Sequence, residues 1–448
     1  MSKIEKQKLS EQISDQTSGL EFMPGFNNHF STEAIEGGLP IGQNSPQRHP
    51  MGLYTEQISG SAFTAPNALN RRSWLYRIRP SVLHISRLSP TEPNLIRTAP
   101  TSDESLLPAG ALRWNPLEIP QEPTDLIEGL TTMATSGDCR LQKGLAAHVY
   151  RVNKSMDNRY LCNADGEMLF VPEQGAMIFV TEYGILDAAP GEIVLIPRGV
   201  KFRADPISET ARGYVCENYG QNLSLPERGP IGANMLANER DFLYPVAAYE
   251  DIERPCQLIF KSQGRLYLSE IPHSPLDVVA WHGNHAPFKY DLSRFAAVNT
   301  VTFDHADPSI FTILTSPSET PGTANMDFVI FPARWSVAEN TFRPPWYHMN
   351  VMSEFMGLIK GVYDAKPGGF KPGGASLHNS MIPHGPDADA YLEATKRELK
   401  PERLINTLAI MFEGRYPMSP TAFASDPRLI DGKYGDCWSN LPRKFPRN

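Results

Sequence analysis

The sequence has little charge, and its charge balance is acidic. Only 21% of the 448 residues are charged, with 42 basic against 50 acidic residues and a formal net charge of −8. A nucleic-acid-binding surface needs a basic excess, so we expect no nucleic-acid partner. No run approaches the ~18 apolar residues of a membrane span, and residues 1–17 lack the apolar core of a secretory signal. We therefore expect neither a membrane segment nor a secretory leader.

Cysteine and the common cofactor motifs are also scarce. The five cysteines are widely spaced and include no Cys-x-x-Cys pair, which predicts reduced thiols in a cytoplasmic protein. No Gly-x-Gly-x-x-Gly opens a helix after a strand, and neither a P-loop nor a Gly-x-Ser-x-Gly elbow is present. The glycine-rich residues 368–374 match none of these patterns and predict a flexible loop. Dinucleotide, nucleoside-triphosphate and serine-hydrolase chemistry are thereby disfavoured.

Turn-forming residues are abundant instead, with 40 prolines and 33 glycines spread along the chain. Strand-like runs follow one another at intervals near ten residues over 144–218, and similar runs return over 298–362, which is typical of a sandwich or barrel. Helical signal is thin: residues 388–399 are the best candidate and 402–412 a weaker one. The sequence predicts a mainly β protein of two modules, residues 1–290 and 291–448.

The first module carries a cupin-like pattern without its metal ligand. Residues 191–202 read Gly, five residues, Pro-x-Gly and two residues, with Phe202 where the cupin motif places a histidine. Phenylalanine cannot bind a metal, so this pattern predicts a cupin-like, jelly-roll type barrel kept for structure. An ordinary strand, turn and strand would explain the same residues.

Histidine, the commonest protein ligand for iron, copper and zinc, is concentrated in one quarter of the chain. His348 and Glu354 are six residues apart, so an extended strand would present both on one face, whereas a helix would separate them by about 240°. Seven of the 11 histidines lie in this quarter: His273, His282, His285, His305, His348, His378 and His384.

Glu354 lies in an otherwise apolar stretch, residues 351–359, and needs a partner there. A buried salt bridge, for example to Arg343, is one explanation, and metal ligation is the other. His378 or His384 could supply a third ligand. Two histidines and one carboxylate form the facial triad of non-haem Fe(II) oxygenases, although zinc with a bound water uses similar ligands.

These motifs resemble the homogentisate 1,2-dioxygenase family along almost the whole chain. A highly specific match is Phe-Arg-Pro-Pro-Trp-Tyr-His-Met-Asn-Val-Met-Ser-Glu-Phe-Met-Gly over residues 342–357. Further matches cover residues 23–26, 52–64, 72–81, 299–314, 372–378 and 383–389. The resemblance implies an N-terminal β domain and a smaller, cupin-like C-terminal domain, assembled as a homohexamer from two trimers.

The resemblance also implies a reaction and its cofactor. It implies Fe(II) held by His348, Glu354 and His384. The expected activity is extradiol-type ring cleavage of homogentisate (2,5-dihydroxyphenylacetate) by O₂ to give 4-maleylacetoacetate in tyrosine and phenylalanine catabolism. The competing class is a non-catalytic or isomerase-type cupin that binds a small molecule through zinc.

Substrate contacts follow from the same resemblance. His305 corresponds to the proton acceptor of the family, and an imidazole titrating near neutrality suits that task. The alternative is a structural imidazole held between its flanking aspartates. Tyr363 and His384 correspond to residues that contact the substrate, and His378 is expected to line the pocket.

Overall fold

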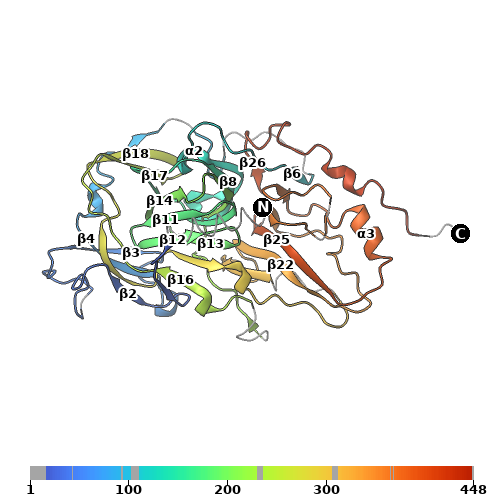
Figure 1. The fold of residues 1–448 in the computed structure, drawn as a ribbon, viewed down its shortest axis with the longest axis horizontal. Coiled ribbons are helices and arrows are strands. Elements are labelled where there is room, and N and C mark those ends of the chain that lie inside the picture. Colours follow the sequence, from blue (N-terminus) through green and yellow to red (C-terminus); the bar gives the residue numbers. More distant parts are fainter. Residues whose placement is uncertain are drawn as a thin grey trace. The chain divides into compact units, whose positions relative to one another are not determined.

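The structure is a computed structural model that describes residues 17–42, 44–91, 94–101, 110–229, 236–304, 311–363, 365–366 and 368–445. The chain divides into two compact units (Figure 1). Unit 1 comprises Met1–Pro100, Glu118–Asn222 and Ala237–Arg294, and unit 2 comprises Thr101–Leu117, Leu223–Leu236 and Phe295–Asn448. Two short segments from the first 290 residues thus belong to unit 2.

Unit 1 consists of antiparallel sheets with one parallel pair, β9 and β17. Its largest sheet contains, in spatial order, β1 (Phe22–Pro24), β16 (Phe242–Pro245), β20 (Phe288–Asp291), β13 (Glu192–Ile196), β10 (Glu167–Gln174), β15 (Ala211–Asn218), β8 (Lys143–Val152) and β7 (Leu130–Asp138). The second contains β12 (Gly184–Ala188), β11 (Met177–Thr181), β14 (Lys201–Pro206), β9 (Arg159–Asn163), β17 (Cys256–Ser262), β18 (Arg265–Ile271) and β5 (Ser89–Pro90). The third contains β2 (Phe30–Glu33), β19 (Val278–Gly283), β4 (Arg72–Arg77) and β3 (Tyr54–Ser59).

The cupin-like motif of residues 191–202 connects two of these sheets. β13 lies in the first sheet and β14 in the second, and Gly199 in the turn between them has a φ of +82°, which favours glycine. Phe202 is fully buried, with its ring 5.8 Å from that of Phe170. The position that a metal-binding cupin gives to histidine is therefore part of the apolar core.

Unit 2 is built on one antiparallel sheet of six strands. Their spatial order is β21 (Thr312–Ser316), β22 (Met326–Ser336), β25 (Glu402–Gly414), β23 (Ser353–Lys360), β24 (Ala375–His378) and β6 (Leu112–Trp114). In Figure 1 the long strands β22 and β25 run side by side. A two-residue strand, β26 (Ser419–Pro420), follows β25 in the chain.

Helices are short in the part of the chain that the structure describes. The α-helices are α2 (Leu126–Gly129) and α3 (Ala388–Ala394), and the 3₁₀ turns are η1 (Asn67–Leu69), η2 (Ser81–Leu83), η3 (Cys139–Leu141), η5 (Glu239–Asp241), η6 (Leu292–Arg294) and η8 (Tyr434–Trp438). None of the described helices has the length and apolar character needed to cross a bilayer. The prediction of a mainly β protein is confirmed.

Two local predictions differ from the structure, one in its type and one in its length. Residues 402–412, predicted as a weak helix, form β25, because pairing with β22 and β23 buries positions 407–412 and overrides helix propensity. Helix α3 begins after its cap Asp387, as expected from the sequence, but ends at Ala394.

Candidate metal centre

A row of polar side chains crosses the sheet of unit 2. In the strand register, Asp327 on β22 is opposite Glu413 on β25, which is opposite Glu354 on β23, which is opposite His378 on β24. Directly paired residues share a face of the sheet, and like charges opposite one another repel. The three carboxylates therefore need compensating partners on this face.

His348 and His384 approach Glu354 from loops rather than from the sheet. The two loops pair through reciprocal backbone hydrogen bonds, His348 N to His384 O at 2.9 Å and His384 N to His348 O at 3.0 Å. β23 begins only at Ser353, so the expectation that one extended strand carries both His348 and Glu354 is wrong. A turn between them, in which Asn350 Oδ1 accepts from Met352 N, brings His348 back over Glu354.

Backbone carbonyls determine the tautomer of both imidazoles. His348 Nδ1 lies 2.8 Å from the carbonyl oxygen of Trp346, and His384 Nδ1 lies 2.9 Å from that of Ile382. A carbonyl can only accept, so each Nδ1 carries a proton and a neutral ring keeps its lone pair on Nε2. Both lone pairs then face Glu354.

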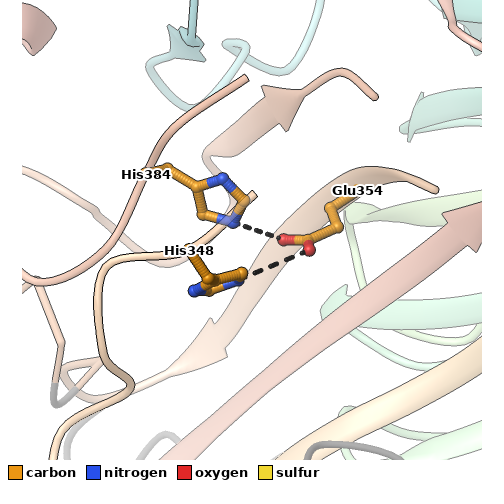
Figure 2. Close-up of side chains that lie close together, drawn as sticks. All are labelled: His348, Glu354 and His384. Carbon is orange, nitrogen blue, oxygen red and sulfur yellow. Dashed lines mark hydrogen bonds and ion pairs between the residues drawn. The ribbon is translucent and has the colours of Figure 1, made fainter. Parts of the chain in front are cut away.

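Figure 2 shows the two imidazoles turned toward the Glu354 carboxylate. His384 Nε2 is 3.0 Å from Glu354 Oε2, and His348 Nε2 is 3.8 Å from Oε1. One donor atom from each residue lies within 4.8 Å of the other two. Nitrogen lone pairs this close to a carboxylate require a proton or a metal cation between them, and two imidazoles with one carboxylate are the donors of a facial triad.

The environment keeps the carboxylate charged. Burial alone would raise the pKa of Glu354, which is 6% exposed, but the adjacent imidazoles of His348 and His384 hold that pKa well below its usual range. The nearby Glu354 carboxylate raises the pKa of His348, against a smaller opposing effect of burial. Glu354 is therefore held as a buried anion that faces both imidazoles.

Asn350 secures the other oxygen of Glu354. Its Nδ2 donates to Glu354 Oε1 at 3.4 Å and makes a short contact with Glu413 Oε1. Its backbone oxygen accepts from Met381 N at 2.7 Å, in the loop that leads to His384. Asn350 thus connects both histidine loops to two carboxylates of the polar row. The alternative explanation of Glu354, a salt bridge to Arg343, does not hold, because Arg343 donates to the carbonyls of Ala338 and Lys400.

A cavity of about 420 Å³ opens beside these donors, within the usual range for small-molecule pockets. His348, Glu354, His384, Tyr363 and His378, which the sequence singled out, all line it. Apolar side chains form much of the remaining wall, among them Phe331, Trp346, Met356 and Met411. Lys366 also lines the cavity.

Sequence reasoning missed a buried network behind His378. Lys366 Nζ lies 3.3 Å from His378 Nε2 and makes a short contact with the Tyr434 hydroxyl, which is itself 2.7 Å from His378 Nε2. Burial lowers the pKa of Lys366 to about 8 and, more than the repulsion from Lys366, holds the pKa of His378 well below its usual value. Lys366 follows Tyr363 closely in sequence, but nothing in the sequence places Tyr434 here.

One predicted site residue cannot be placed. His305 lies outside the described residues, which resume at residue 311. Residues 301–304 just before it are exposed and bend, where the sequence predicted a strand. The proton-acceptor assignment of His305 therefore stays a prediction.

Solved structures show only weak likeness to the chain. A mutant of Bacillus subtilis oxalate decarboxylase is 11% identical, with a TM-score of 0.30 over 72% of this chain and 82% of that chain. The Ylba protein of E. coli is 10% identical, with a TM-score of 0.27 over 69% of this chain and 93% of that one. These TM-scores are too low to support an inference about function.

Comparison with protein families and sequences is decisive. The family model "Homogentisate 1,2-dioxygenase N-terminal" matches residues 21–292, and "Homogentisate 1,2-dioxygenase C-terminal" matches residues 293–445. A homogentisate 1,2-dioxygenase of Rhodopseudomonas palustris is 58% identical over 442 residues, covering 99% of this chain and 98% of the relative. That of Bradyrhizobium diazoefficiens is 59% identical over 427 residues, covering 95% of each. The chain belongs to the homogentisate 1,2-dioxygenase family.

Proposed function

We propose that this chain is a ring-cleaving dioxygenase that converts homogentisate and O₂ to 4-maleylacetoacetate in tyrosine and phenylalanine catabolism. One carbon–carbon bond of the ring breaks, and both oxygen atoms enter the product. The observation that carries the proposal is the convergence of two imidazole Nε2 atoms and one carboxylate on a cavity wall. The names of the relatives support the choice of substrate.

The donor set suits Fe(II). His348, Glu354 and His384 would hold the metal through two neutral nitrogens and one anionic oxygen, a combination that favours iron over thiolate-seeking metals. When bound, Fe(II) would supply the redox chemistry by which a singlet aromatic molecule reacts with triplet O₂. The hydrogen bonds from each Nδ1 to a backbone carbonyl would fix the orientation of the rings before the metal arrives.

The rest of the cavity would bind and orient one aromatic ring. Phe331 and Trp346 provide apolar wall, and Tyr363 and His378 provide polar groups at its edge. A base must help to remove a phenolic proton from the substrate, and we assign this role to His305 from the family resemblance. A homohexameric assembly of two trimers and a cytoplasmic location are part of the same proposal.

An oxygen-electrode assay with homogentisate, with and without added Fe(II) and ascorbate, tests this function. We expect O₂ uptake that depends on iron and equals the homogentisate consumed. Glu354→Gln should abolish it, whereas the matched change Glu398→Gln, at a side chain 77% exposed, should not. Stoichiometric zinc in anaerobically purified protein, with no O₂ uptake, would favour the zinc-binding cupin instead.

A further inference from the structure

Three buried polar side chains from distant parts of unit 2 meet at the cavity wall, which Lys366 and His378 line and Tyr434 does not. Lys366, His378 and Tyr434 are 6%, 1% and 2% exposed. Lys366 follows the turn at Tyr363, His378 ends β24, and Tyr434 begins η8. No carboxylate forms an ion pair with Lys366 among the described residues, so a buried cation is placed here against a histidine and a phenol.

The hydrogen-bond polarity of this cluster follows from its donors. An ammonium has three protons and no lone pair, so Lys366 donates to the Tyr434 oxygen. The Tyr434 proton then has one acceptor among its two partners, His378 Nε2 at 2.7 Å. Lys366 also directs a proton toward that nitrogen from 3.3 Å. An imidazole that accepts at Nε2 carries its own proton on Nδ1.

The surrounding side chains hold this geometry in place. The Arg113 guanidinium lies 4.5 Å from the Tyr434 ring centroid and also forms an ion pair with Asp431, which precedes the start of η8 at Tyr434. The Trp438 ring packs 5.3 Å from that of Tyr434. The His378 ring stacks on His384, with centroids 4.2 Å apart and planes 6° apart. Neither the Tyr434 ring nor the His378 ring can therefore turn without breaking several contacts.

The opposite nitrogen of His378 has no such partner. Nδ1 is buried, has no hydrogen-bond partner in the described part of the chain, and lies 3.9 Å from Glu354 Oε2. A buried N–H that remains unpaired is energetically unfavourable, because it has given up its hydrogen bonds to water. His378 lines the cavity, so a ligand atom bound beside Glu354 could provide the missing acceptor.

We infer that Lys366 and Tyr434 are positioning residues that hold His378 in its Nδ1–H tautomer, so that it presents a hydrogen-bond donor to an oxygen atom bound beside Glu354. The oxygen would belong to the phenol of the aromatic substrate or to dioxygen. Only the identity of this oxygen rests on the proposed function. The tautomer does not, and it can be measured on the protein without substrate.

Four variants isolate this role. Tyr434→Phe removes the hydroxyl but keeps the ring, and Lys366→Met removes the ammonium but keeps the length of the side chain. Tyr416→Phe and the exposed Lys360→Met, both in unit 2, are matched controls. We expect iron content and melting temperature near wild type for Tyr434→Phe and a fall in kcat/KM of about 10–100-fold, as for other groups that orient a site indirectly.

Steady-state kinetics distinguish the two sources of the oxygen atom. A rise in KM for homogentisate alone would assign the donor to the phenolic oxygen, whereas a fall in kcat with a raised KM for O₂ would assign it to dioxygen.

A double variant tests whether Tyr434 acts through His378. In a His378→Asn background the amide nitrogen takes the place of Nδ1–H without help from Nε2. Adding Tyr434→Phe there should change kcat/KM less than twofold, because the hydroxyl no longer has a nitrogen to orient.

Solid-state ¹⁵N NMR of histidine-labelled protein reads the tautomer directly, with His378→Asn identifying the resonances. We expect a protonated Nδ1 and an unprotonated Nε2 in the wild type, and a mixture of tautomers in Tyr434→Phe. A protonated Nε2 in the wild type would mean that His378 donates to the Tyr434 oxygen, and it would overturn the inference. So would unchanged kinetics in Tyr434→Phe and Lys366→Met at full iron content. Failure of the wild type to consume O₂ would refute the proposed function and leave the NMR result to decide the tautomer.

Discussion

Replacing Glu354 with glutamine should keep the fold and remove the stabilisation of unit 2 by metal. The amide is nearly isosteric, but the anionic donor is lost from a cluster whose other donors are neutral imidazoles. A metal bound only to the native state stabilises it by about 2.7–4.1 kcal/mol at ~100–1,000 times its Kd. At about 2–4 °C per kcal/mol for a unit of 150–250 residues, the melting temperature should rise by about 5–16 °C.

Differential scanning calorimetry with and without added Fe(II), under anaerobic conditions, measures this shift. The wild type should show it, and Glu354→Gln should show almost none while retaining a cooperative transition. Glu398→Gln is the control and should behave like the wild type. A full iron-dependent shift in Glu354→Gln, with iron content to match, would refute the assignment of Glu354 as a ligand.

The same pair of proteins, stripped of metal, should differ in a pH-dependent way. The lowered pKa of Glu354 contributes stability above the unfolded carboxyl pKa of about 4.3, and this contribution is lost as the pH falls. The raised pKa of His348 contributes stability that is complete below the unfolded imidazole pKa of about 6.5 and is lost as the pH rises. The stability difference should therefore be greatest, about 1.5–3 kcal/mol, between those values. Denaturant titrations from pH 4 to 8 that give a constant difference would contradict this account.

Other substitutions probe the surroundings of the site. Asn350→Ala should lower metal affinity about 10–100-fold, because it frees Glu354 from its amide partner; equal affinity in a competition titration with a chelator would contradict this. His305→Gln should keep iron and slow turnover by about 10²–10⁴-fold, and normal turnover at full iron would end its assignment as the base. Phe202→His should restore no activity to His348→Ala, because Phe202 is sealed in the core of unit 1; recovered ring cleavage would show this reasoning to be wrong.

Much of the fold was predictable because strands here carry their own signal. Apolar runs bounded by glycine and proline identified β8, β10, β11 and β13 directly. β25 was not identified because its Leu, Ala and Met residues also favour helix, and only pairing with strands far away in sequence decides between the two. Local propensity could not supply that contact.

The candidate site likewise contains residues that the sequence could identify and residues that it could not. His348 and Glu354 could be paired from their spacing and from the unusual position of a glutamate among apolar residues. The predicted reason for this pairing, one strand that carries both residues, was wrong, because a loop anchored by Asn350 brings His348 to Glu354 instead. Lys366 and Tyr434 could not have been found, because isolated lysine and tyrosine residues carry no pattern until the fold buries them together.

The strand β6 has a consequence for the synthesis of this protein. It precedes its partner β24 by roughly 260 residues, which at ~5–20 residues per second take about 13–50 s to translate. During that interval the Trp114 side chain lacks its native partners, because the segments that cover it have not been translated. One of them supplies the carbonyl of Ala424, to which the Trp114 indole donates in the folded protein. A recombinant fragment starting near residue 293 would expose the unpaired edge of β24 and is expected to aggregate. Expression of unit 2 alone should therefore require residues 101–117 to be supplied, in the same chain or as a separate peptide.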